Sequence, residues 1–245
     1  MKTKPRLYTN ALFLLLLANV LAYTTVHLCY LFMMESFGIY LELARTYIVK
    51  AWEIAMYPIS CAVLLVGFAH SGRRNAVGGA ALISLCRLGY SLPYYYMYFL
   101  GLGFDSGEAI LIDLGISALM YLLNFGVLVL CLYLSTVLAK RSEGSYPFGT
   151  SRFIRDALLG RVADHRSIVG RIILPSVVVG IVSELLSEIY DTITFFIDYM
   201  SSFSISEVLL ICFNYLFIVA VGIGVYYLSC LISLRIGKRI CDQEP

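Results

Sequence analysis

Long apolar runs alternate with short polar segments along the whole chain. Six runs reach the roughly 20 residues that an α-helix needs to cross a bilayer, and they cover approximately residues 11–34, 47–70, 77–100, 109–139, 171–198 and 207–234. No segment shows the apolar–polar alternation that is typical of a transmembrane β-barrel. The pattern therefore predicts an all-α, polytopic transmembrane helix bundle of six spans, which forms a single domain over residues 1–245.

The composition agrees with a chain whose solvent is mostly lipid. Hydrophobic residues make up 60% of the sequence and charged residues 14%, whereas soluble domains average about 45–50% and about 25%. The first run is about 24 residues long, longer than the roughly 7–15-residue core of a signal peptide. We therefore interpret it as a retained helix, with cleavage after the Ala18–Ala22 region as the alternative.

The basic residues predict the orientation. When six helices are drawn, 15 of the 18 Lys and Arg residues fall on one side, and the opposite loops carry mainly acids such as Glu35, Asp105 and Glu108. Basic loops stay in the cytoplasm, so we expect both termini inside, at the plasma membrane. Basic flanks also recur after the second, fourth and sixth spans, which favours three related hairpins.

A longer cytoplasmic loop, residues 141–170, separates the fourth and fifth spans. Apolar residues recur there at helical spacing: Phe153, Ile154, Ala157, Leu158 and Val162. This pattern predicts a short amphipathic helix on the inner leaflet, with its arginines toward anionic lipid. We interpret the loop as a connector on the membrane surface, and the alternative is a docking site for a cytoplasmic partner protein.

Charged residues inside the spans are the candidates for function, because each costs about 2.5–3.5 kcal/mol to insert at mid-bilayer. In the fifth span Glu184, Glu188, Asp191 and Asp198 share an arc of roughly 80°. Arg87 in the third span is the expected counter-charge, paired with Glu184 or Glu188. The predicted solute or ion pathway consists of Glu184, Glu188, Asp191, Arg87, Asp113, Glu53, Tyr94 and Asn124.

Most of these carboxylates lie toward the outer ends of their predicted helices. Together they would form an acidic vestibule that opens outward and concentrates cations or protonated amines. The alternative is purely structural: a buried Arg–Glu pair can hold helices together, and acids at helix ends can reach headgroups and water.

Sequence motifs for catalysis or cofactors are missing. The chain contains no H-E-x-x-H, G-x-S-x-G, P-loop or dinucleotide fingerprint, and its cysteines have no metal-ligand spacing. We expect no cofactor, no metal, no catalytic residue and no nucleic-acid partner. An intramembrane hydrolase or transferase would have to use the carboxylates as acid and base, and it is the less favoured class.

Six spans, basic cytoplasmic ends and the small-residue pair Ala18-x-x-x-Ala22 resemble the substrate-binding membrane subunits of energy-coupling-factor vitamin transporters. The size and span count also resemble six-helix permease subunits of ABC exporters. These resemblances imply a transport subunit and assign no site residue. We therefore expect a small-solute transporter, or its membrane subunit, for a cationic solute or coupling ion. The alternative is a scaffold or sensor that acts through partners bound at residues 141–170 or at the first span.

Overall fold

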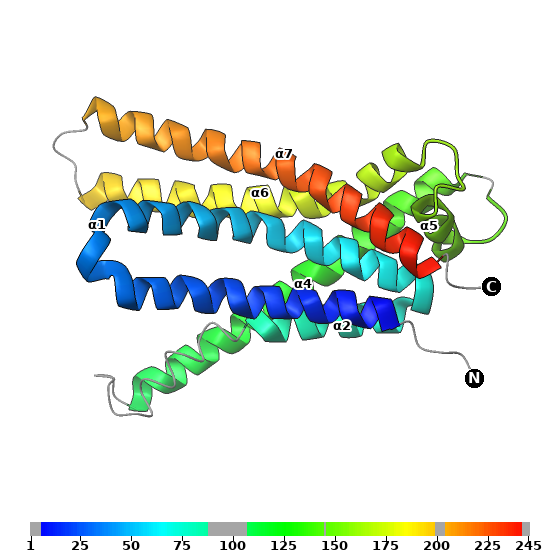
Figure 1. Ribbon diagram of the computed structural model, residues 1–245, viewed down its shortest axis with the longest axis horizontal. Helices are drawn as coiled ribbons and strands as arrows, with labels where there is room; N and C mark the ends of the chain where they lie inside the picture. The colour runs from blue at the N-terminus through cyan, green and yellow to red at the C-terminus, as the bar shows by residue number, and fades with distance from the viewer. Residues whose placement is uncertain (1–5, 88–106, 145, 199–203, 242–245) are drawn as a thin grey trace.

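A computed structural model describes residues 6–87, 107–144, 146–198 and 204–241, and all regular structure in these segments is helical (Figure 1). Side chains at 6–9, 20, 22–45, 71, 86–87, 107–113, 195, 197–198 and 240–241 lie outside this description. The helices are α1 (Arg6–Ser71), α2 (Arg73–Arg87), α4 (Gly107–Glu143), α5 (Thr150–Leu158), α6 (His165–Asp198) and α7 (Ile205–Cys241). The all-α prediction is confirmed for these segments.

Four stretches within these helices are long and apolar enough to cross a membrane: Thr46–His70, Leu114–Glu143, His165–Thr194 and Ile205–Arg239. They overlap the predicted spans 47–70, 109–139, 171–198 and 207–234. Predicted span 11–34 lies within α1, and its described apolar part is Asn10–Asn19. Predicted span 77–100 begins within α2, and residues 88–100 are outside the described segments. The chain thus has the helical character of a membrane protein.

Helix α1 folds back on itself. The indole N–H of Trp52 donates to Asn19 Oδ1 over 3.1 Å, and the Asn19 amide donates to Met56 Sδ over 3.2 Å. A straight helix would separate residues 19 and 52 by about 50 Å, so α1 forms two arms that lie side by side (Figure 1). Residues 35–46, which the sequence analysis places in a connector, are helical, and this segment is rich in the strong helix formers Leu, Glu and Ala.

The second arm of α1 is the central helix of the bundle. Helix α1 as a whole packs against α2, α4, α5, α6 and α7, and 72% of the most apolar stretch of its second arm is buried, against 17–33% in α4, α6 and α7. Those three helices instead expose many large apolar side chains, among them Leu122, Leu186, Leu209 and Leu216. Apolar surface on this scale suits a lipid environment.

Small residues let the helices approach closely. A Cβ atom on Gly180 of α6 would lie 2.5 Å from the backbone oxygen of Ile54 in α1, so only glycine fits there. Because Gly222 of α7 has no side chain, the Ile181 side chain of α6 can pack directly against it. Close backbone approach at small residues is the usual way in which transmembrane helices pack.

One end of the bundle is basic. The start of α1, the turn between α1 and α2, the start of α6, helix α5 and the end of α7 all lie there, whereas the end of α6 and the start of α7 lie at the opposite end (Figure 1). We call it the basic end, and its residues are Arg73, Arg74, Lys140, Arg141, Arg152, Arg155, Arg161, Arg166, Arg235, Lys238 and Arg239.

Helix α5 lies within the predicted loop 141–170 and closes the basic end. Its apolar residues Phe153, Ile154, Ala157 and Leu158 are buried where α5 packs against α1, α4, α6 and α7. The neighbouring helices, rather than lipid, therefore cover the apolar face of α5. Tyr146 donates a hydrogen bond to the carboxylate of Asp156.

Candidate functional site

A largely buried group of polar side chains joins three of the apolar helices. Lys50 of α1 forms an ion pair with Glu188 of α6. The Asn214 amide of α7 donates to Glu188 Oε1 over 2.8 Å, and the Tyr47 hydroxyl of α1 donates to Asn214 Oδ1 over 2.8 Å. We call these four residues the polar cluster. The Glu188 side chain is only 6% exposed, so the cluster supplies the partners that a buried carboxylate requires.

Further carboxylates surround the ion pair. Glu184 is half-buried one helical turn before Glu188, and it lies within electrostatic range of Lys50, Glu53, Glu188 and Asp191. Asp191 is exposed one turn beyond Glu188. Among the residues that the structure describes, Lys50 and the carboxylates of Glu53, Glu188 and Asp191 thus lie around Glu184. A region rich in carboxylates attracts cations.

The polar cluster lies in the half of the bundle away from the basic end. Lys50 is 21 residues before the end of α1 at Ser71, and Glu188 is 23 residues after the start of α6 at His165. At about 1.5 Å per residue, these two helix ends lie about 32 Å and about 35 Å away. The similar depths explain how residues on oppositely directed helices meet.

The structure brings together four of the predicted pathway residues and places others elsewhere. Glu53, Glu184, Glu188 and Asp191 share one region. Asn124 of α4 is buried and accepts a hydrogen bond of 2.8 Å from the Tyr57 hydroxyl of α1. The side chains of Arg87 and Asp113, and the whole of Tyr94, lie outside the described residues.

Sequence reasoning missed the partners of Glu188. The structure pairs Glu188 with Lys50, whereas the expected pairing of Arg87 with Glu184 or Glu188 stays a prediction, because the Arg87 side chain is outside the described residues. Neither Lys50 nor Asn214 is among the predicted pathway residues. A strongly polar amide inside the apolar run 207–234 was the available signal, because such residues rarely face lipid.

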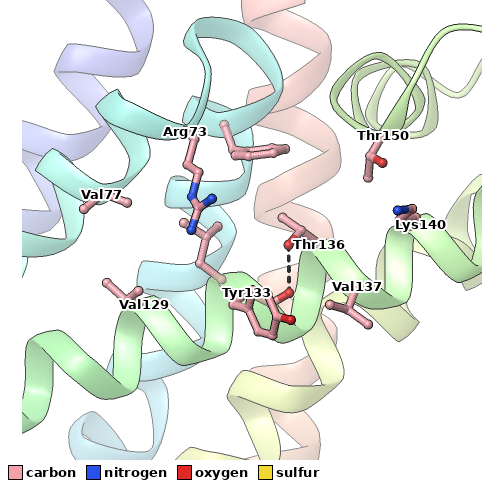
Figure 2. A pocket seen from close by; sticks show the side chains of 10 residues that line it. Arg73, Val77, Val129, Tyr133, Thr136, Val137, Lys140 and Thr150 are labelled. Carbon is pink, nitrogen blue, oxygen red and sulfur yellow. Dashed lines mark hydrogen bonds between the residues drawn. The ribbon is translucent and has the colours of Figure 1, made fainter.

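A second candidate site lies at the basic end, in a pocket of about 360 Å³ between α1, α2, α4 and α5 (Figure 2). We call it the basic-end pocket. Arg73 and Lys140 supply its positive charge, and its polar lining includes Thr136 and Thr150. Its remaining lining residues are Phe68, Val77, Val129, Leu132, Tyr133 and Val137. No sequence pattern singled out this pocket.

No protein-family model, curated protein or solved structure matches the chain significantly. The polar cluster and the basic-end pocket are accordingly the features from which we infer its function.

Proposed function

We propose that this chain is a multi-pass protein of the plasma membrane, with six spans and both termini in the cytoplasm. In this proposal it moves a small cationic solute or a coupling ion across the bilayer, alone or as the membrane subunit of a larger transporter. The basic end supports the orientation, because basic segments are retained in the cytoplasm. The observation that carries the transport proposal is the buried Lys50–Glu188 pair with Glu184 and Glu53 beside it.

Lys50 acts in this proposal as a tethered substitute for the transported cation. A buried carboxylate without a partner costs several kcal/mol, so Glu188 requires a cation or a proton at every stage. A cation that arrives from the acidic half of the bundle takes the place of the ammonium at Glu188. The flexible lysine side chain then moves away, which removes the ion pair between α1 and α6 and allows the two helices to shift.

The test is uptake into liposomes that contain the purified full-length protein. Radiolabelled sodium, rubidium, methylammonium and choline serve as probes, and protein-free liposomes give the background. Variants Glu184→Gln and Glu188→Gln remove one charge each. Asp164→Asn is the matched control, because Asp164 is exposed at the α6 start and its positive φ of 55° suits asparagine.

We expect wild-type protein to take up at least one probe, Glu188→Gln to lower the rate by about tenfold or more, and Asp164→Asn to leave it unchanged. A loss of this size corresponds to about 1.4 kcal/mol, below the cost of breaking a buried pair. Unchanged uptake in both glutamine variants would remove the carboxylates from the mechanism. Uptake of no probe by folded protein would favour the alternative function.

That alternative is a scaffold or sensor that acts through partner proteins. Exposed arginines around α5 favour it, since Arg152, Arg161 and Arg166 point away from the packed helices. Crosslinking from positions 152–166 in native membranes tests this function. Recovery of one specific protein at these positions would support it, and recovery of lipid alone would contradict it.

A further inference from the structure

We propose that the basic-end pocket binds an anionic phospholipid of the inner leaflet, with the headgroup phosphate at Arg73 and Lys140 and an acyl chain along the apolar wall. This site is distinct from the polar cluster. The proposal requires a membrane at the basic end but does not require transport.

The two cations come from different helices and line the same pocket. Arg73 begins α2 directly after Gly72, whose φ of +87° allows the chain to turn sharply from α1. Figure 2 shows its guanidinium directed from α2 toward α4, while Lys140 lies near the end of α4 with Thr150 close to it. Both cations are exposed, and neither forms an ion pair within the part of the chain that the structure describes. Their charge is thus available to a ligand.

Hydroxyl groups lie between the two cations. Thr136 donates to the backbone oxygen of Tyr133 over 2.7 Å, so its oxygen still has lone pairs that can accept a hydrogen bond. The Tyr133 ring is largely exposed beside it. Hydrogen-bond donors and acceptors between the two cations suit a phosphate ester and the glycerol of a phospholipid.

The pocket has an apolar wall beside its two cations. Lys140 and Val129 both line it and lie 11 residues apart on α4, which corresponds to about 16 Å along the helix. Val129 lies within the apolar stretch Leu114–Glu143, so the deeper part of the pocket is at the level of lipid tails. A soluble anion would leave this apolar wall exposed, whereas a phospholipid covers it.

Charge selects the class of phospholipid. Basic pockets between membrane helices on the cytoplasmic side bind anionic headgroups, and each Lys or Arg near the surface contributes about fivefold in affinity. A zwitterionic lipid carries its own cation, which repels Arg73 and Lys140. We therefore expect a preference for anionic over zwitterionic lipid.

Native mass spectrometry of the full-length protein in detergent tests the proposal. The probes are phosphatidylglycerol, phosphatidylcholine and the soluble headgroup glycerophosphoglycerol. Arg73→Gln with Lys140→Gln removes the pocket's charge, and Arg74→Gln with Arg166→Gln is the control with the same change of net charge. Val129→Trp fills the apolar part and leaves both cations in place.

We expect wild type and control to prefer phosphatidylglycerol by at least about fivefold, and the pocket double variant to lose that preference. Val129→Trp should weaken binding of phosphatidylglycerol and thereby tests the apolar wall even if the double variant fails to fold. An unchanged preference in a folded double variant, together with no effect of Val129→Trp, would overturn the proposal. Competition by the soluble headgroup at equal affinity would also overturn it, since a soluble anion would then be the ligand.

Discussion

Lys50 of α1 pairs with Glu188 of α6, a residue 138 positions further along the chain. Both side chains are buried, at 13% and 6% exposure. The pair joins the central helix of the bundle to a helix that borders lipid, and Asn214 connects it to a third helix. Both the stability and the proposed transport cycle of this protein depend on it.

Removing one partner of this pair should destabilise the protein more than removing both. Lys50→Met or Glu188→Gln leaves the other residue buried without its opposite charge, which should lower the free energy of unfolding by about 3–5 kcal/mol. The double variant removes both members of the pair and should recover part of this loss. Denaturant titration of the four proteins in micelles measures the coupling. Strictly additive effects would show that the two residues do not interact.

Asn214 should contribute to the stability of the protein mainly through its hydrogen bond to Glu188. Asn214→Leu removes the hydrogen bond to the charged Glu188, worth about 1.5–3 kcal/mol, and also the neutral one from Tyr47, whereas Tyr47→Phe removes only the neutral hydrogen bond, worth about 0.5–1.5 kcal/mol. The same denaturant titration measures both, and Tyr227→Phe is the control because Tyr227 is an exposed tyrosine of α7. If Glu188→Gln is already present, Asn214→Leu should cost less. An equal cost in both backgrounds would contradict this link.

The close contact between α6 and α1 at Gly180 should tolerate no side chain. Gly180→Ala places a Cβ atom 2.5 Å from the Ile54 backbone oxygen, and the helices must separate at a cost of about 1–3 kcal/mol. Gly224→Ala on α7 is the matched control, because nothing lies within 4 Å of its added Cβ. Alanine should stabilise α7 there by about 0.5–1 kcal/mol. The midpoint of thermal unfolding should therefore fall in Gly180→Ala and rise in Gly224→Ala. A shift of both variants in the same direction would contradict the close packing at Gly180.

The hydrogen bond between Tyr146 and Asp156 should make the Tyr146 phenol ionise at a higher pH than that of free tyrosine. It raises the pKa of the Tyr146 phenol, because the neutral phenol donates to the carboxylate and the phenolate would be repelled by it. The bond is fully present below the ordinary tyrosine pKa of about 10, and its contribution to stability is lost as the pH rises through the higher folded-state pKa.

The difference in phenolate absorbance between wild type and Tyr146→Phe reports this titration. Asp156→Asn should return the pKa of Tyr146 toward that of free tyrosine. Ionisation of Tyr146 at or below about pH 10 in the wild type would contradict the expected shift.

The long apolar helices were predictable because apolar run length is a property of consecutive residues. The run 207–234 lies inside α7 for this reason. The fold-back of α1 was also anticipated as two antiparallel spans, but its helical connection was not. Acids such as Glu35 and Glu42 suggested a loop there, although glutamate is also a good helix former.

The partner of Glu188 could not be predicted in the same way. The acid spacing indicates a polar stripe on one helix, but which neighbour faces that stripe depends on how the helices pack. Close contacts such as Gly180 against Ile54 determine this arrangement, and small residues occur on many helices. The role of Tyr47 could not be predicted from the sequence either, because tyrosines at span ends are common at the membrane interface.

The central position of α1 has a consequence for biosynthesis. Its second arm emerges from the ribosome before α6 and α7, which pack against α1. At about 5–20 residues per second, the 138 residues between Lys50 and Glu188 take roughly 7–28 seconds to translate. During that interval the lysine has no α6 carboxylate to meet. The ion pair between α1 and α6 can therefore form only after most of the intervening helices have been made.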